Sequence, residues 1–134
     1  MPNWIQQGSA NLDGGPFNGW FVGKLGAWCA QNGIDYDPQE MALRDTPILE
    51  IKWGIHPQGQ RRPGGWAGPS DQVSVSLLVR GRFLIRFRSL ESPDQETSYL
   101  LKSEGDYVIW REEGEHTWQA EEDSVILTVR WRPG

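Results

Sequence analysis

Three stretches of this 134-residue chain, residues 48–56, 82–88 and 124–131, carry side chains with the period of two that a β-strand imposes. In the clearest of them, Phe83, Ile85 and Phe87 share one face and arginines share the other, so we expect the apolar face to point inward. Further strands are predicted at 73–79, 98–101, 107–110 and 116–120. Sixteen glycines and nine prolines break the chain into short pieces. The pattern predicts an all-β sandwich or barrel of about eight strands.

The first 47 residues are less regular and predict an N-terminal arm. Residues 11–20 are rich in glycine, proline and asparagine and indicate a loop, while residues 20–24 suit a short edge strand. Asp37 and Pro38 suit the start of one helical turn over residues 38–43. We therefore expect one domain, in which an arm of residues 1–47 packs on a barrel of residues 48–134 or crosses to a second subunit. The whole should hold at most one or two short helices.

Composition narrows the partners that such a domain would take. The net charge of −5 disfavours nucleic acid and anionic membranes. No apolar run approaches the roughly 20 residues of a membrane helix. Cys29 is the single cysteine and makes no internal disulfide, and with no apolar leader at the N-terminus this predicts a cytoplasmic protein. Eight tryptophans, each able to bury about 150–250 Å², compensate for an apolar fraction of only 37%.

The stretch from residue 105 to residue 120 predicts a hairpin that organises the chain. Gly105 supplies a turn, residues 107–110 form a strand, residues 111–115 form a charged loop, and His116 begins the returning strand. The hairpin resembles the second conserved motif of the cupin superfamily, in which a histidine follows the first glycine by eleven positions. Gly105 and His116 keep that spacing, whereas Arg111 and Glu113 replace the usual proline and glycine of the turn.

The preceding strands extend the resemblance. Residues 73–87 resemble the end of the first cupin motif, with Gly81 as its closing glycine. Together the two motifs span about residues 48–130 and leave the arm uncovered. The resemblance implies an all-β, cupin-like jelly-roll barrel, also called a double-stranded β-helix. It is strongest to small single-domain bacterial cupins with no assigned reaction.

The resemblance also predicts which metal ligands are missing. Metal-binding cupins place a glutamate and two histidines in the first motif, and here these positions fall on Ser74, residues 67–68 and residues 69–70. Only His116 remains of the usual quartet, and His56 and Asp71 are the residues that could join it. We therefore expect no cofactor and predict that the purified protein carries no stoichiometric transition metal.

The strand at 73–79 sets two expectations against each other. The resemblance turns Ser74, Ser76 and Leu78 toward the barrel interior, whereas simple alternation buries the valines and leucine between them. Both hold if a second strand layer or a second subunit covers the outer face. We therefore expect a homodimer, which would also protect exposed sheet edges.

The candidate site lies around His116, which we expect to face the barrel interior near Trp53, Trp66 or Trp118. The predicted ligand-binding residues are His116, Trp118, Trp53, Trp66, Ser74, Ser76, Arg61 and His56. Arg61 and Arg62, and with less support Arg111 and Arg130, could clamp a carboxylate or phosphate. Cys29 is interpreted as structural.

Three classes of function remain open. The first is a metal-free protein that binds or senses an unknown small molecule in an aromatic-lined barrel pocket. The second is a cupin enzyme, either an acid/base isomerase or epimerase-like protein using His116 as candidate catalytic residue, or a metal enzyme with altered ligands. The third is a dimeric interaction module. Because the sequence identifies no second titratable group beside His116, binding ranks first.

Overall fold

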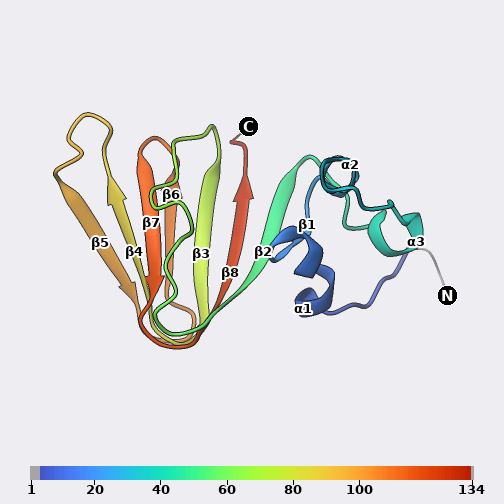
Figure 1. The fold of residues 1–134 in the computed structure, drawn as a ribbon, viewed down its shortest axis with the longest axis horizontal. Helices are drawn as coiled ribbons and strands as arrows, with labels where there is room; N and C mark the ends of the chain where they lie inside the picture. The colour runs from blue at the N-terminus through green and yellow to red at the C-terminus, as the bar shows by residue number, and fades with distance from the viewer. Residues whose placement is uncertain (1–3, 134) are drawn as a thin grey trace.

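The computed structural model describes residues 4–133, which form two antiparallel sheets packed face to face (Figure 1). The larger sheet has the order β1-β2-β8-β3-β6 and the smaller has the order β5-β4-β7. The strands are β1 (Trp20–Val22), β2 (Leu49–His56), β3 (Val73–Arg80), β4 (Phe83–Arg88), β5 (Glu96–Leu101), β6 (Tyr107–Arg111), β7 (Glu115–Ala120) and β8 (Ser124–Trp131). This arrangement confirms the predicted all-β, cupin-like barrel.

The structure shows which residues of strand β3 face the barrel interior. Ser74, Ser76 and Leu78 are buried between the sheets, with exposed fractions of 2%, 5% and 0%. The residues between them are half-buried and point to the outer face. The serines therefore face inward as the resemblance implied, and alternation of hydrophobicity alone gave the wrong face for this strand. Gly81 turns the chain from β3 in one sheet to β4 in the other. Glycine is required here because φ is +105° and because a Cβ would meet the carbonyl oxygen of Asp123.

The apolar core fills one end of the space between the sheets. Leu78 and Ile126 from the larger sheet meet Phe83, Ile85 and Leu101 from the smaller sheet, with Ala120 completing the cluster. Leu78 and Ile126 are cross-strand neighbours, as are Phe83 and Leu101. The inward orientation predicted for Phe83, Ile85 and Phe87 is confirmed, with Phe87 packed against the edge of this cluster.

The N-terminal arm holds more helix than the sequence predicted. It contains α1 (Ala10–Asp13), η1 (Gly15–Phe17), α2 (Leu25–Asn32) and α3 (Pro38–Met41), so the expectation of at most one or two short helices is wrong. The α3 turn was predicted, and Asp37 does cap it by accepting a hydrogen bond from the Gln39 backbone N–H at 3.0 Å. The longest helix, α2, has no side-chain cap at Lys24 and so lacked a sequence signal for its start.

Tertiary packing holds the arm together and ties it to the barrel. Leu25 and Cys29 lie one turn apart on α2 and pack with Phe17 and Trp28 in a small second core. Strand β1 joins the larger sheet beside β2, with Trp20 opposite Lys52. The arm therefore lies beyond the β2 edge of the sheet (Figure 1) and brings Trp20 to the barrel.

The long loop between β2 and β3 runs along the free edge of β7. Backbone hydrogen bonds join the Arg62 N–H to the Trp118 carbonyl at 3.0 Å and the Ala67 N–H to the His116 carbonyl at 2.7 Å. A further bond joins the Ser70 N–H to the Glu112 carbonyl at 2.8 Å. The loop thus acts as an irregular extra strand, and it places the segment that corresponds to the replaced metal motif beside His116.

Candidate functional site

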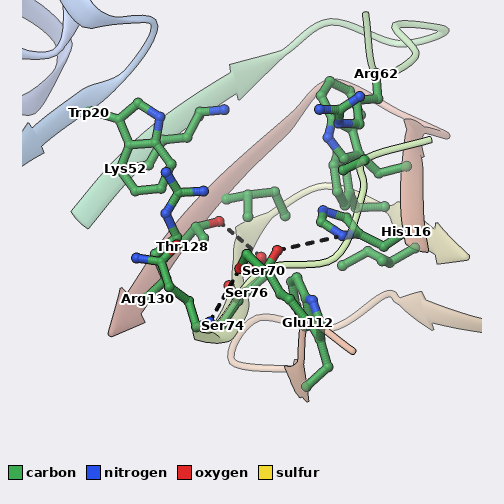
Figure 2. Close-up of a pocket in the computed structure, with 18 of the residues that line it drawn as sticks. Trp20, Lys52, Arg62, Ser70, Ser74, Ser76, Glu112, His116, Thr128 and Arg130 are labelled. Atoms are coloured by element: carbon green, nitrogen blue, oxygen red, sulfur yellow. Dashed lines mark hydrogen bonds and ion pairs between the residues drawn. The ribbon is translucent and has the colours of Figure 1, made fainter. Parts of the chain in front are cut away.

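A cavity of about 400 Å³ lies between the two sheets, next to the apolar core (Figure 2). Phe83, Ile85 and Ile126 contribute its apolar floor, and they belong to that core. The rest of its wall is largely polar and comes from β2, β3, β6, β7, β8 and the loop before β3. The barrel interior is thus filled at one end and hollow at the other.

Hydroxyl groups form the wall contributed by β3 and β8. Ser74 lies opposite Arg130, and Ser76 lies opposite Thr128, in the register of the two strands. The Ser76 and Thr128 hydroxyls are 2.9 Å apart and hydrogen-bonded. One hydroxyl of such a pair donates to the other, which leaves one O–H able to donate elsewhere.

Cationic side chains gather on the wall nearest the N-terminal arm. Figure 2 shows Trp20, Lys52 and Arg130 grouped on one side of the cavity. The Arg130 guanidinium lies 4.2 Å from the Trp20 ring centroid and forms an ion pair with Glu50, with Nη2 2.7 Å from Oε2. The Lys52 Nζ lies 5.6 Å from the same ring centroid. Burial lowers the pKa of Lys52, and the nearby charges of Arg130 and Arg62 lower it further.

His116 and Glu112 face each other across the turn of the β6–β7 hairpin. The His116 Nδ1 is 3.7 Å from Glu112 Oε1, and Ser70 donates a hydrogen bond of 2.7 Å to Glu112 Oε2. Glu112 is 6% exposed. Burial lowers the pKa of His116, Glu112 opposes this, and the positive charges of Arg62 and Arg130 add to the lowering. His116 therefore favours its neutral form, which carries a free ring nitrogen lone pair that could accept a proton.

The second histidine, His56, lies deeper on the β2 wall. Its Nδ1 is 2.7 Å from Gln60 Oε1, a distance at which a protonated Nδ1 donates to the amide oxygen. Its ring lies 4.4 Å from the Trp118 ring centroid. Burial lowers the pKa of His56, the Gln60 hydrogen bond opposes this, and the Lys52 charge adds to the lowering. The Cβ of any larger residue at position 54 would lie 2.5 Å from His56 Nε2, so Gly54 avoids a steric clash with the imidazole.

Five of the predicted site residues line this cavity. They are His116, Trp118, His56, Ser74 and Ser76. Two of the arginines considered as clamps, Arg62 and Arg130, line it as well. His116 is inward and shares the cavity with Trp118, as the hairpin spacing predicted.

Three predicted residues do not line this cavity, and we no longer place them at the site. Trp53 lies on the outer face of β2 and lines an adjoining hollow beside the arm, which shares Lys52 and His56 with the cavity. Trp66 lies under the outward-facing Arg88, whose Cζ is 4.0 Å from the Trp66 ring centroid. Arg61 is exposed and pairs through its backbone with Gln119. Arg111, the weaker arginine candidate, is exposed at the end of β6.

Sequence reasoning missed Lys52, Glu112, Thr128 and Trp20. The alternation of β2 already put Lys52 on the same face as His56, which was a usable signal. Glu112 gave no such signal, because it stands in a charged turn with Glu113 and Glu115 that suited a solvated loop. Trp20 comes from the arm, and its approach to Lys52 depends on the pairing of β1 with β2.

The residues at the replaced motif do not fit a transition metal. Within residues 4–133 there is no group of three or more histidine, cysteine, aspartate or glutamate side chains placed to hold a metal ion. The position that carries a glutamate in metal-binding cupins presents the Ser74 hydroxyl opposite the Arg130 cation. Asp71 pairs instead with Arg132 on the surface. Neutral hydroxyls bind transition metals weakly, and a neighbouring positive charge repels a metal cation. Elemental analysis of untagged protein would test the predicted lack of metal.

Known proteins resemble the chain through structure rather than sequence. No protein-family model and no curated protein matches the sequence. None of the helices in the described part of the chain is long and apolar enough to span a membrane.

Solved structures with this architecture include cupins. SPY1581, a conserved protein of unknown function from Streptococcus pyogenes, matches at a TM-score of 0.53 with 20% identity, over 67% of this chain and 69% of that one. The cupin protein BF4112 from Bacteroides fragilis matches at 0.53 with 16% identity, over 66% and 70%. KdgF from a Halomonas species matches at 0.52 with 18% identity, over 66% and 74%. At these identities the likeness concerns the fold, and the chain has the fold of a small cupin-like domain.

Proposed function

We propose that this protein binds or senses a small polar molecule in the cavity between its two sheets. The observation that carries the proposal is the cavity itself, about 400 Å³, with hydroxyl, imidazole, amide and charged side chains in its lining. Protein interiors are close-packed, and voids that stay empty are small or apolar. A hollow of this size and polarity has the dimensions of a ligand site.

Ligand-dependent melting of matched variants tests the proposal. Ser76→Leu would fill the cavity from β3, and Val75→Leu places the same leucine side chain on the outer face of the same strand as a control. We expect one or more compounds of a metabolite panel to raise the melting temperature of wild type and of Val75→Leu but not that of Ser76→Leu. Equal shifts in all three proteins would place binding outside the cavity and contradict the proposal.

The second candidate is an acid/base enzyme, favoured by one specific observation. Glu112 supplies beside His116 the second titratable group that acid/base chemistry normally needs. A neutral His116 would accept a proton from a bound substrate, and Glu112 would stabilise the imidazolium that forms. The test is exchange of a ligand C–H for deuterium in D2O, followed by NMR. Exchange that is lost in His116→Gln and in Glu112→Gln would support an enzyme, whereas binding with no exchange would favour a binding protein.

The homodimer and the cytoplasmic location belong to the same proposal. The outer face of β3 carries valine and leucine side chains that the described chain leaves half-exposed. On the same face of the sheet, Ile55 of β2 and Ile109 of β6 are 57% and 52% exposed. A second copy laid against this face would cover them. The single cysteine, Cys29, is buried and free, which suits a reducing compartment.

A further inference from the structure

The charges around the cavity do not balance. Its lining contains three cationic side chains, Lys52, Arg62 and Arg130, and one carboxylate, Glu112. Glu50, on the same face of β2 as Lys52, pairs with Arg130. When that pair is set aside, two cations, Lys52 and Arg62, remain against one carboxylate. Burial keeps both histidines toward their neutral forms, so they do not alter the sum at neutral pH. The cavity is therefore short of negative charge.

Lys52 is the cation that lacks a partner. Arg130 has Glu50, and Arg62 donates to the backbone carbonyls of Pro63 and Gly65 at 3.0 and 3.2 Å. The Lys52 ammonium makes no side-chain hydrogen bond or ion pair with any residue in the part of the chain that the structure describes, 4–133. Its recorded contact is with the Trp20 ring, 5.6 Å from the centroid.

Three arginines outside the cavity have carboxylate partners. Arg86, Arg88 and Arg132 each form an ion pair with a carboxylate, at 3.2, 2.9 and 3.0 Å. An unpaired ammonium is more costly in a partly desolvated cavity than in water. An arriving anion would offset this cost at Lys52, and the sum of local charges favours an anion over a cation or a neutral group.

Hydrogen-bond donors next to Lys52 complete an anion site. Thr128 is the cross-strand neighbour of Lys52, and Ser76 is the cross-strand neighbour of Thr128. Because these two hydroxyls bond each other, one O–H remains to donate to a ligand oxygen. Trp110 lines the cavity farther from Lys52, on β6, and its buried Nε1–H has no hydrogen-bond partner within the described residues. Carboxylate and phosphate oxygens are acceptors for all three kinds of donor.

We infer that the ligand of this cavity is a small anion, an organic acid or a phosphorylated metabolite, whose charged group binds at Lys52 between Trp20 and the Ser76–Thr128 pair. The inference rests on the proposed function and names the ligand class of that same site. The position of the cations inside a cavity, in a chain of net charge −5, points to a small ligand rather than an acidic surface or polymer.

Titration calorimetry with three classes of compound tests the inference. The classes are small organic acids, phosphorylated metabolites and neutral polyols, with gluconate against sorbitol and glucose 6-phosphate against glucose as matched pairs. Wild type should bind an acid or a phosphate ester at least ten times more tightly than its neutral partner. The anionic class that binds identifies the charged group as a carboxylate or a phosphate. Binding of inorganic phosphate alone would show that the phosphate group is enough, without the rest of the metabolite.

Variants at position 52 show whether the charge is responsible. Lys52→Met keeps much of the apolar stem and should weaken anion binding about ten- to a hundredfold. Lys52→Arg keeps the charge and should retain most of the affinity, and Lys102→Met, at an exposed position, should leave it unchanged. A neutral ligand that binds equally well to wild type and Lys52→Met would overturn the inference while the proposed function stands. The lack of any binder in all three classes would count against both.

A second measurement does not depend on a folded Lys52 variant. In protein labelled at its lysines, NMR titration should show the pKa of Lys52 rising toward its ordinary value when the anion binds, because the anion compensates the neighbouring arginines. The lysine at position 102 serves as the internal reference. A bound anion that leaves the pKa of Lys52 unchanged would place the charged group elsewhere and overturn the inference.

Discussion

The two faces of the larger sheet have opposite characters. Its inner face carries Ser74 and Ser76 from β3, Thr128 and Arg130 from β8, and Lys52 from β2. Its outer face is almost wholly apolar. The outward residues include Leu49, Ile51, Trp53, Ile55, Val73, Val75, Leu77, Tyr107, Ile109, Val125, Leu127, Val129 and Trp131, with Arg111 as a charged exception at the end of β6. A sheet with one face in a core and one in water normally has the reverse arrangement.

The difference indicates where the proposed ligand and the proposed second copy would bind. The inner face is polar where it lines the cavity. It is apolar at Leu78 and Ile126, where the two sheets pack against each other. The outer face keeps core composition although no described segment covers it, since Ile55 and Ile109 remain more than half exposed. Large contiguous apolar patches mark interfaces. One face thus suits a ligand and the other suits a protein surface, here proposed to be a second copy.

A charge on the outer face should produce the largest effect. Val75 lies between Val129 and Ile109 in the register of the sheet. In a dimer formed through this face, Val75→Lys would bury an unpaired charge at a cost of about 3–5 kcal/mol, which weakens association by two to three orders of magnitude. Light scattering coupled to size-exclusion chromatography should show a dimer for wild type and a monomer for the variant.

Gln95→Lys is the matched control, because it adds the same charge in an exposed loop away from the face. It should remain a dimer. Two outcomes would contradict an interface on this face: a wild type that is monomeric at micromolar concentration, or a Val75→Lys variant that is still a dimer. A dimer interface would then not explain the apolar composition of the face.

Neighbouring inward positions on β3 should differ in their contribution to stability. Leu78 is fully buried in the apolar core, so Leu78→Ala should lower the free energy of unfolding by about 2–5 kcal/mol. Ser76→Ala removes one hydroxyl that bonds Thr128 and should cost about 0.5–1.5 kcal/mol. Urea denaturation of both variants measures the difference, and equal losses would mean that the polar half of the interior is as tightly packed as the apolar half.

The sequence predicted the barrel because its signals are local. Alternation in β4, glycines at the turns and the spacing between Gly105 and His116 each depend on a few neighbouring residues. The same signals predicted that His116 faces inward beside Trp118. Alternation failed on β3 because it assumes that the apolar face is the inner one, and in this sheet the polar face is.

The rest of the site depends on contacts between distant parts of the chain. Trp20 reaches Lys52 only through the pairing of β1 with β2, about thirty positions apart in the sequence, and no local rule gives that register. Glu112 turns inward while Glu113 stays exposed, a choice made by the Ser70 hydroxyl and the turn geometry rather than by residue type. The start of α2 could not be predicted either, since packing of Leu25 and Cys29 substitutes for a cap.

Removing the unpaired charge should stabilise the unliganded protein slightly. The pKa of Lys52 is lower in the folded state than in the unfolded chain, so at neutral pH the charged side chain opposes folding, and this penalty disappears above its ordinary pKa. Lys52→Met should therefore raise the free energy of unfolding by about 0.5–1 kcal/mol at pH 7. Chemical denaturation at pH 7 measures the change, with Lys102→Met as control. A destabilised Lys52→Met protein would mean that the ammonium has a stabilising partner on the inner face.

The smallest expected effect concerns the buried histidines of the inner walls. Burial lowers the pKa of His56, so the unfolded chain binds a proton at higher pH than the folded protein does. Its contribution to stability is complete above the unfolded pKa of about 6.5 and declines as the pH falls below that value. Wild type should therefore lose stability between pH 7.5 and pH 5.5, before most carboxylates titrate. His56→Phe keeps an aromatic ring against Trp118 and Phe83 but cannot take up a proton, so its melting temperature should fall less over the same interval.

His116→Gln should flatten the pH profile less than His56→Phe does, because Glu112 partly compensates a proton on His116. Melting curves at half-unit pH steps provide the measurement, and parallel profiles for wild type and His56→Phe would show that His56 accepts a proton in the folded protein as readily as in the unfolded chain.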